Sequence, residues 1–280
     1  MDPLTAPARS WLFVPANRHE RFAKAAASGA DRVIVDLEDA VSSADKSEAC
    51  ASLSGAALPA SVPVYLRVNA ANTPWFDENI EMAGRLRLTG VMLPKAESPA
   101  DVARAASRLP HAFTIVPIVE TAAGVWNVRD VARAERVERV VFGALDFELD
   151  TGILEGDDTF AFARASVAMA SRIAAIAPPI DSVTIAIDDE RRLMRDAERS
   201  RRFGFAGKLC IHPKQAPVLN GVFRPSDEEI EWATAVLEER SRRPHDGVFA
   251  FRGTMVDRPV IERARRIQSL GTGPGSMRDA

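Results

Sequence analysis

Cysteine and histidine are scarce in this chain of 280 residues. Its two cysteines, Cys50 and Cys210, lie far apart and outside any C-x-x-C spacing, so the sequence indicates neither a disulfide framework nor a cysteine-ligated zinc site. The four histidines form no cluster, which argues against zinc or non-haem iron. A reducing cytoplasm is the compartment that fits this composition best.

Long apolar runs and an excess of one charge are also missing. No stretch of about eighteen apolar residues occurs, as a membrane span needs, and no basic segment followed by a long apolar one opens the chain. Lys and Arg number 36 against 39 Asp and Glu, and the basic residues are scattered among the acidic ones. We therefore expect a soluble, unprocessed protein with neither a nucleic acid nor a membrane as partner.

Apolar residues make up 46% of the chain, which is enough for a large core without disulfides or a structural metal. Short β-branched runs alternate with segments of helical period, the pattern of parallel strands joined by crossover helices. Eight runs are predicted strands: Ser10–Val14, Arg32–Asp36, Val62–Val68, Gly90–Leu93, Phe113–Ile118, Arg139–Phe142, Ser182–Ile187 and Gly207–Ile211. Eight strand–helix units predict a closed (β/α)8 TIM barrel, although an open doubly wound sheet shares the local pattern.

The chain after the eighth predicted strand indicates a helical extension. A helix is expected from about Ser226, which caps it together with Glu229 three residues on. A Gly-containing loop and a last helix from about Pro259 follow. We assign residues 1–222 to the barrel and 223–280 to the extension, which we expect to pack on a neighbouring subunit.

Acidic residues interrupt the apolar pattern where predicted strands end, which is the place where barrel folds carry their active sites. Glu120 follows the fifth strand and Asp146 follows the sixth. On adjacent strands their carboxylates would share one part of the rim, and two carboxylates completed by water and substrate are a usual magnesium site. Each acid also has a structural alternative, since Glu120 could cap the next helix and Asp146 could brace the FELDTG loop.

Arg67 ends the third predicted strand, in VPVYLRVN, and a guanidinium suits an anionic substrate because it forks onto a carboxylate. The alternative is a buried ion pair with Asp36 or Glu38. In DLEDAV these two acids lie two residues apart, hence on one face of a continuing strand, and Asp39 starts the next loop or helix. The three acids are supporting candidates that would hold metal-bound waters or orient Arg67, and a purely structural role stays open.

Seven stretches of the chain, in order from Arg9 to Ile267, resemble the citrate lyase beta subunit-like branch of the HpcH/HpaI aldolase superfamily. They are RSWLFVPANRHERFAKAAASGADRVIVDLEDAV, YLRVNAANTPWFDENI, GVMLPKAES, VPIVETAAGVWN, FGALDFELDTG, GFAGKLCIHPKQ and GTMVDRPVIERARRI. One such stretch would be weak evidence, whereas an ordered set of seven is specific.

This resemblance implies a (β/α)8 barrel, commonly a homotrimer or hexamer, with Mg²⁺ held by Glu120 and Asp146. It implies that Arg67 binds substrate and that Glu120 touches substrate as well as metal. It also implies that Asp257, in MVDRP, reaches the active site of a neighbouring subunit. From the residues alone, Asp257 is predicted to cap the helix that begins near Pro259.

Other residues in the matching stretches are expected to shape the rim of the site. Lys95, Lys208 and His212 match the family pattern, and His212 is interpreted as a structural histidine. Three basic residues lie where a coenzyme A phosphate could bind: Arg18, Arg21 and Lys24. A solvated basic helix face is the favoured interpretation of those three.

The activity that the resemblance implies is magnesium-dependent carbon–carbon cleavage of a short hydroxy-acyl thioester of malyl, citramalyl or citryl type. The products would be a 2-oxo acid and an acetyl thioester, carried on coenzyme A or on an acyl-carrier protein. Three activities remain as alternatives: an aldolase for a free 2-oxo-3-deoxy acid, a malyl-CoA thioesterase, and a lyase subunit that depends on a carrier protein. From another class, the chain could be a barrel whose acids are only structural.

Overall fold

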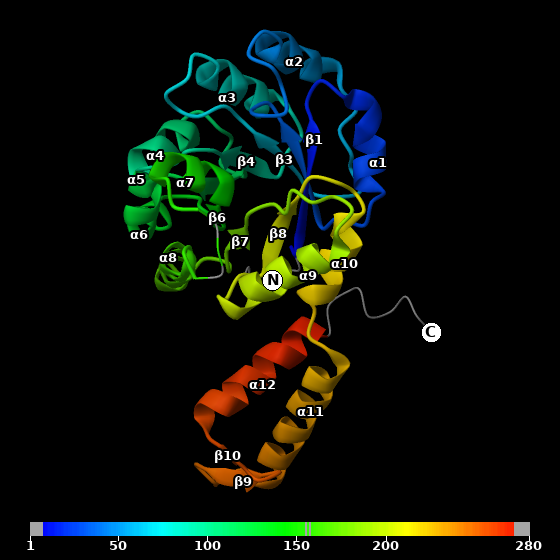
Figure 1. Ribbon diagram of the computed structural model, residues 1–280, viewed down its shortest axis with the longest axis vertical. Coiled ribbons are helices and arrows are strands. Elements are labelled where there is room, and N and C mark those ends of the chain that lie inside the picture. The colour runs from blue at the N-terminus through cyan, green and yellow to red at the C-terminus, as the bar shows by residue number, and fades with distance from the viewer. Residues whose placement is uncertain (1–7, 155, 157, 272–280) are drawn as a thin grey trace. The chain divides into compact units, whose positions relative to one another are not determined.

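The computed structural model describes residues 8–154, 156 and 158–271, and the chain divides into two compact units. In the first unit, Ala8–Phe223, eight parallel strands close into a barrel in sequence order, with β8 pairing with β1 (Figure 1). The strands are β1 Ser10–Pro15, β2 Arg32–Asp36, β3 Val64–Arg67, β4 Gly90–Leu93, β5 Thr114–Val119, β6 Val141–Phe142, β7 Ile180–Asp181 and β8 Gly207–Cys210. The predicted closed barrel is confirmed, and the open sheet is excluded.

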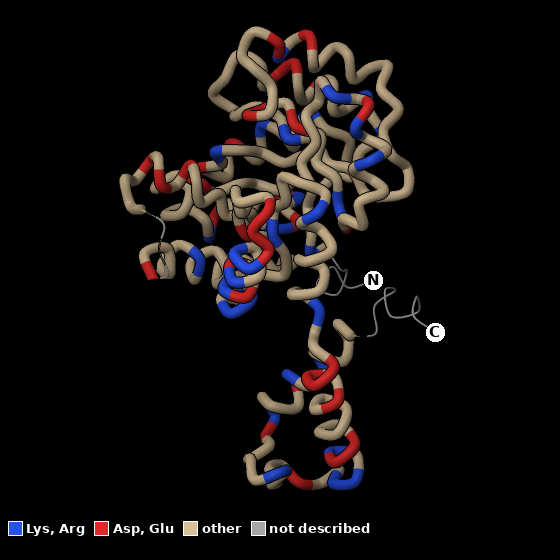
Figure 2. The backbone as a smooth tube through the Cα atoms, turned by 45° about the vertical axis from the view of Figure 1, so that its right-hand side comes forward, with Lys and Arg blue, Asp and Glu red and all other residues tan. Residues whose placement is uncertain are grey.

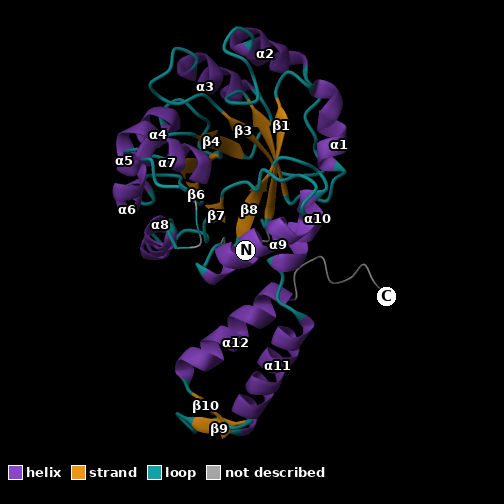
Figure 3. Ribbon diagram, viewed as in Figure 1, coloured by secondary structure: helices purple, strands orange, loops and turns teal. Residues whose placement is uncertain are grey.

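Helices follow the strands and surround the barrel (Figure 3). They are η1 His19–Arg21, α1 Phe22–Ala26, α2 Lys46–Ser52, η2 Leu53–Gly55, α3 Phe76–Arg85, α4 Pro99–Ala106, α5 Ala122–Trp126, α6 Val128–Val131, α7 Ala144–Thr151, α8 Ala161–Ile173, α9 Glu190–Arg202 and α10 Gln215–Val222. Ser98 caps α4 through a hydrogen bond to the Asp101 N–H, with Pro99 at the first helical position. The loop between β4 and α4 therefore enters a helix with a well-defined first turn.

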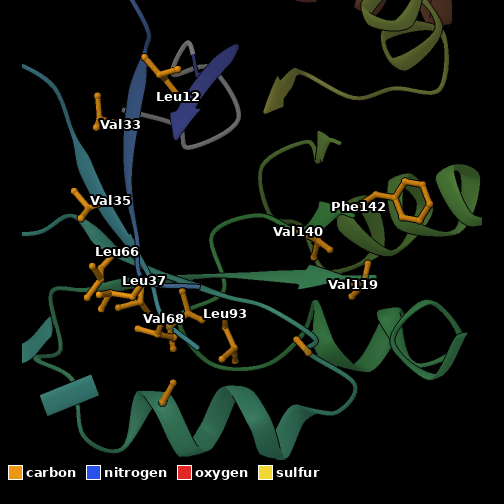
Figure 4. Packing of buried hydrophobic residues seen from close by; sticks show 14 of the residues in the cluster. Leu12, Val33, Val35, Leu37, Leu66, Val68, Leu93, Val119, Val140 and Phe142 are labelled. Atoms are coloured by element: carbon orange, nitrogen blue, oxygen red, sulfur yellow. The ribbon is translucent and has the colours of Figure 1, made fainter. Parts of the chain in front are cut away.

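Alternating side chains along each strand separate two apolar layers. On β2, Val33 and Val35 face outward and pack with residues of the surrounding helices, whereas Ile34 faces the barrel interior. Figure 4 shows part of the outer layer, including Val33, Val35 and Leu66. The inner layer consists of Ala8, Trp11, Ile34, Tyr65, Met92, Val116, Ile118, Val141, Ile180 and Leu209. By the same alternation, Asp36 is the next inward residue of β2 after Ile34. It lies at the rim, above the inner apolar layer.

The prediction of the seventh strand at Ser182–Ile187 is wrong. The strand is β7 Ile180–Asp181, which pairs with β6 and β8, and the following residues leave the sheet. Ser182 instead accepts a hydrogen bond from the Ala144 N–H, and Ile185 and Ile187 are exposed. The β-branched residues between Ser182 and Ile187 favoured a strand there, whereas Pro178 and Pro179 argued against a strand immediately before it. A proline is tolerated before the first ladder bond of a strand, so the true strand begins immediately after them.

The second unit, described over residues 224–271, has its own small core. Its helices α11 Asp227–Arg242 and α12 Arg258–Gly271 pack on a hairpin of β9 Phe249–Phe251 and β10 Thr254–Val256. Ser226 and Glu229 form the predicted capping box of α11. The hairpin lies where only a Gly-containing loop was expected. It turns at Arg252 and Gly253, both of which have positive φ angles, as a tight two-residue hairpin turn requires.

The described residues include no helix that is long and apolar enough to cross a membrane. Basic and acidic residues are interspersed along the chain in Figure 2. Cys50 and Cys210 are both buried thiols that are not joined in a disulfide. Burial raises the pKa of Cys50 to about 11, so it stays protonated at neutral pH.

Candidate functional site

A cavity of about 700 Å³ opens at the carboxyl ends of the barrel strands. Its lining includes Asp36, Asp39, Arg67, Glu120 and Asp146, which come from the second, third, fifth and sixth strand–helix units. The structure therefore brings these five residues, all singled out from the sequence, into one cavity. This size is typical of a pocket for a small ligand.

Arg67 is held in the site by acidic residues. Its Nε and Nη2 donate to the two carboxylate oxygens of Asp36, each at 2.7 Å, and Nη1 lies 2.8 Å from Glu38 Oε2 and 3.3 Å from Asp39 Oδ2. The guanidinium also lies over the Phe13 ring at 4.5 Å. Burial alone would lower the pKa of Arg67, but these carboxylates raise it, so Arg67 is a fixed cation. The buried ion pair, left open as an alternative, is present.

Asp36 also organises the loop that follows β2. Its Oδ1 accepts a hydrogen bond from the Glu38 N–H at 2.9 Å, and its Oδ2 accepts one from the Ala40 N–H at 3.1 Å. Lys46 Nζ donates to the carbonyl oxygens of Leu37 at 3.0 Å and Glu38 at 2.7 Å. The loop therefore has a fixed path, which directs Glu38 toward Arg67.

Glu120 lies directly after β5 and is only 3% exposed. Burial raises its pKa to about 8, and the neighbouring carboxylates of Glu38 and Asp146 act in the same direction. Gly143, just after β6, makes room for this side chain. A Cβ atom there would lie 2.4 Å from Glu120 Oε2, so any larger residue would displace the carboxylate.

Asp146 and Glu38 approach Glu120 from two other elements. Asp146 lies in the first turn of α7 and has a 30% exposed side chain. Burial raises the pKa of Glu38 to about 7, against the opposing effect of Arg67. Three carboxylates thus gather in a partly desolvated site, where their mutual repulsion favours a bound cation.

Lys95, expected only to shape the rim, is a central residue of this cluster. Its Nζ lies 3.3 Å from Glu38 Oε1 and 3.5 Å from Asp146 Oδ1, and its backbone N–H donates to Glu120 Oε1 at 2.8 Å. Its position two residues after β4 was the available signal, because the same rule selected the acids.

The carboxylates of Glu120 and Asp146 are suitable ligands for a hard divalent cation such as magnesium. Glu120 and Asp146 offer carboxylate oxygens at the cavity wall, and both are close enough to couple electrostatically. Among the described residues, no group of three or more His, Cys, Asp or Glu side chains is arranged as a metal site. A cation bound by these two acids would therefore take its other ligands from water or substrate.

Comparison with known proteins identifies the family. The family model described as HpcH/HpaI aldolase/citrate lyase matches residues 9–213. The chain belongs to this family. It is 36% identical to the citrate lyase subunit beta-like protein of Deinococcus radiodurans over 96% of this chain and 99% of the relative. It is 28% identical to the mitochondrial citramalyl-CoA lyase of Mus musculus over 95% of this chain and 86% of the relative.

A solved family member supports both the assignment and the fold. The crystal structure of CitE from Mycobacterium tuberculosis in complex with magnesium, acetoacetate and coenzyme A superposes with a TM-score of 0.85 at 36% identity. The match covers 96% of this chain and 99% of that one. The family and the (β/α)8 barrel predicted from the sequence are confirmed.

Two residues that match the family pattern, Asp257 and Lys208, are not among the residues that line the cavity. Asp257 belongs to the second unit, where its Oδ1 accepts a hydrogen bond from the Val260 N–H at 3.3 Å and caps α12, as predicted. Lys208 is 1% exposed and shares the outward face of β8 with Cys210. The expectation that Lys208 shapes the rim is therefore wrong.

Lys208 has a charged neighbour on the outward side of β7, the buried Asp181. Burial alone would raise the pKa of Asp181, but Lys208 and Arg164 outweigh it and hold that pKa below its ordinary value. Lys208 thus belongs to a buried ion cluster behind the barrel wall. Of the other basic residues expected at the rim, the cavity lining includes Arg21, Lys24 and His212.

Proposed function

We propose that this chain is a magnesium-dependent lyase that cleaves a short hydroxy-acyl thioester into a 2-oxo acid and an acetyl thioester. The family and the citramalyl-CoA lyase relative confirm the predicted class, a carbon–carbon lyase. The CitE relative was crystallised with magnesium, acetoacetate and coenzyme A, which supports an oxo acid and an acyl-CoA as ligands. The substrate within this class is our proposal.

One observation carries the proposal: Glu120 and Asp146 line the same cavity as Arg67 and are close enough to interact electrostatically. We assign Glu120 and Asp146 as the magnesium ligands. When bound, the ion supplies positive charge beside the oxygens of the oxo acid and polarises its carbonyl group. The nearby Glu38 adds negative charge to this part of the site, which favours the cation further.

Arg67 is assigned to the substrate carboxylate or to the oxyanion that develops during cleavage. The Asp36 carboxylate fixes the plane of the guanidinium by two hydrogen bonds, so its orientation is set before substrate arrives. The pairing partner Asp39 has a 62% exposed side chain, and a substrate anion can compete with it for Nη1. We assign a supporting role to the three acids that hold Arg67 in place, which are Asp36, Glu38 and Asp39.

During cleavage the substrate hydroxyl gives its proton to solvent water and becomes the carbonyl of the 2-oxo acid, the carbon–carbon bond breaks, and its electron pair moves to the acetyl thioester as an enolate. We assign Asp257 of a neighbouring subunit to protonate the enolate carbon, which gives the acetyl group. This assignment requires an oligomer, which we propose to be a homotrimer or hexamer, in which residues 224–271 of one copy serve the barrel of another. The oligomer, the cytoplasmic location and the choice between coenzyme A and a carrier protein stay predictions.

The test is a product screen with the purified full chain. Malyl-CoA, citramalyl-CoA, citryl-CoA and free 2-oxo-3-deoxy acids are each supplied with magnesium or with EDTA, and 2-oxo acid, acetyl-CoA and free thiol are measured separately. The proposal expects equal amounts of 2-oxo acid and acetyl-CoA from at least one substrate, only with magnesium. Free thiol without acetyl-CoA would identify a thioesterase instead, and turnover of free 2-oxo-3-deoxy acids alone would identify an aldolase.

A further inference from the structure

Lys95 contacts the acidic cluster at three points. Its ammonium group bridges Glu38 at 3.3 Å and Asp146 at 3.5 Å, while its main-chain N–H binds Glu120 at 2.8 Å. These acids come from the loops after β2 and β5 and from α7. Lys95, which follows β4, thus links acidic side chains from three other parts of the rim.

The backbone of Lys95 adopts an unfavourable conformation that makes these contacts possible. Its φ angle is +49°, in the left-handed region that residues other than glycine rarely adopt. Such a conformation costs on the order of 1 kcal/mol and persists only where the surroundings impose it. Here the hydrogen bond to Glu120 and the ion pairs to Glu38 and Asp146 are the contacts that hold it.

Two other cations near the cluster, Arg67 and Lys46, do not contact Asp146. Arg67 is bound along its Nε and Nη2 edge by Asp36, and its Nη1 contacts the second carboxylate oxygen of Glu38. Lys46 Nζ donates to main-chain carbonyl oxygens. Lys95 is the cation that lies between Glu38 and Asp146, and its side chain is 37% exposed, so it has a path to swing away.

We propose that Lys95 is an internal counter-ion that balances the acidic cluster before magnesium binds and leaves Asp146 when magnesium arrives. The inference rests on the proposed function only in taking Glu120 and Asp146 as metal ligands. An ammonium ion at 3.5 Å from Asp146 and a divalent cation on the same carboxylate repel each other, so binding of one weakens the other. Lys95 thereby keeps the cluster assembled without metal and lowers its affinity for magnesium.

Loss of the Lys95 charge should have opposite effects on the stability of the metal-free protein and on its affinity for magnesium. In Lys95→Met and Lys95→Gln, the metal-free protein should melt at a lower temperature, because Glu38 and Asp146 lose their shared cation. Magnesium should bind these variants about tenfold more tightly, because a repelling charge has gone. A residue that merely supports the fold would lower the melting temperature without tightening metal binding.

Calorimetric titration of the full chain with magnesium chloride tests this. The matched control is Lys214→Met, since Lys214 Nζ also lies 3.3 Å from an aspartate, Asp188, but in an exposed pair outside the cavity lining. The control should bind magnesium like the wild type. Absence of magnesium binding to the wild type would remove both the proposed function and this inference. Wild-type binding with equal or weaker binding by the Lys95 variants would overturn the inference alone.

A measurement on the wild type keeps the proposal testable if the variants fail to fold. Acetylation of lysines by an amine-directed reagent, followed by mass spectrometry, reports how accessible each ammonium group is. Magnesium should increase the acetylation rate of Lys95 several-fold and leave that of Lys214 unchanged. An unchanged or slower rate at Lys95, with magnesium binding established by calorimetry, would contradict its release.

Discussion

Asp36 and Arg67 are register partners on the neighbouring strands β2 and β3, and two N···O contacts of 2.7 Å join their side chains. The pair is almost fully buried, with side chains 2% and 11% exposed. Because Asp36 also binds the N–H groups of Glu38 and Ala40, one carboxylate fixes both the guanidinium and the loop beside it.

Asp36→Asn should therefore destabilise the protein by about 3 kcal/mol, since it leaves part of a buried charge uncompensated. Urea unfolding of the metal-free protein measures this loss. Asp188→Asn is the control, because the Asp188 side chain is 84% exposed in its pair with Lys214 and its loss should be close to zero. Equal stability of the two variants would show that the Asp36 pair does not organise the rim.

Glu120→Gln and Asp146→Asn should each abolish measurable magnesium binding and reduce magnesium-dependent turnover at least about 100-fold. The metal-free Glu120→Gln protein should be as stable as wild type or more so, because a buried carboxyl group is replaced by a neutral amide. Glu97→Gln is the control, since Glu97 is an exposed rim acid that binds Thr121 Oγ1 outside the cavity. Full magnesium binding in both site variants would refute the metal assignment.

Gly143→Ala should displace Glu120, because the added Cβ would meet its Oε2 at 2.4 Å and its Cβ at 2.6 Å. We expect magnesium affinity to fall at least about tenfold with a destabilisation of about 1–3 kcal/mol from overpacking. Calorimetry and urea unfolding measure the two effects. In Gly84→Ala the nearest atom is Pro110 Cδ at 3.9 Å, so this control should keep both properties.

The metal-free protein should lose stability as the pH rises from about 5 to 8. The pKa is raised to about 7 for Glu38 and to about 8 for Glu120, each from an ordinary value of 4.5. A raised carboxyl pKa means that the folded state holds more protons than the unfolded state across this window, so stability falls with pH. Melting temperatures in EDTA should show this slope, saturating magnesium should reduce it, and Glu120→Gln should remove the larger part. A flat profile in EDTA would contradict the burial of these acids.

If Asp257 acts in a neighbouring copy, inactive Glu120→Gln and Asp257→Asn chains should restore activity when mixed. Asparagine keeps the helix cap on α12 while it removes the acid. Random exchange between subunits would return about a quarter of wild-type activity, since one site in four receives both intact residues. The mixture should be assayed after exchange has been verified by mass spectrometry, and no recovery would count against the role of Asp257.

The sequence predicted the barrel and most of the acidic site because both follow a simple rule. Strand alternation sends Asp36 and Arg67 inward, and closure in sequence order brings the ends of β5 and β6 together. The sequence did not predict the contacts of Lys95, because they depend on a left-handed backbone conformation that a lysine does not indicate. The prediction of β7 was wrong because a strand of two residues is too short to show an alternating pattern. The residues alone predicted Asp257 as a helix cap, and its role in a neighbouring active site was inferred from the family resemblance alone.

The brevity of β7 has a consequence for how the enzyme could change its preference among related molecules. Val183 lines the cavity but follows the last ladder residue, Asp181, by two positions, so its main chain is not bound into the barrel. Replacement of Val183 can therefore change this wall of the cavity while every strand pairing stays intact. The next residue, Thr184, is buried and hydrogen-bonded to Asp196 and Gln215, so a change of specificity confined to Val183 leaves those contacts in place.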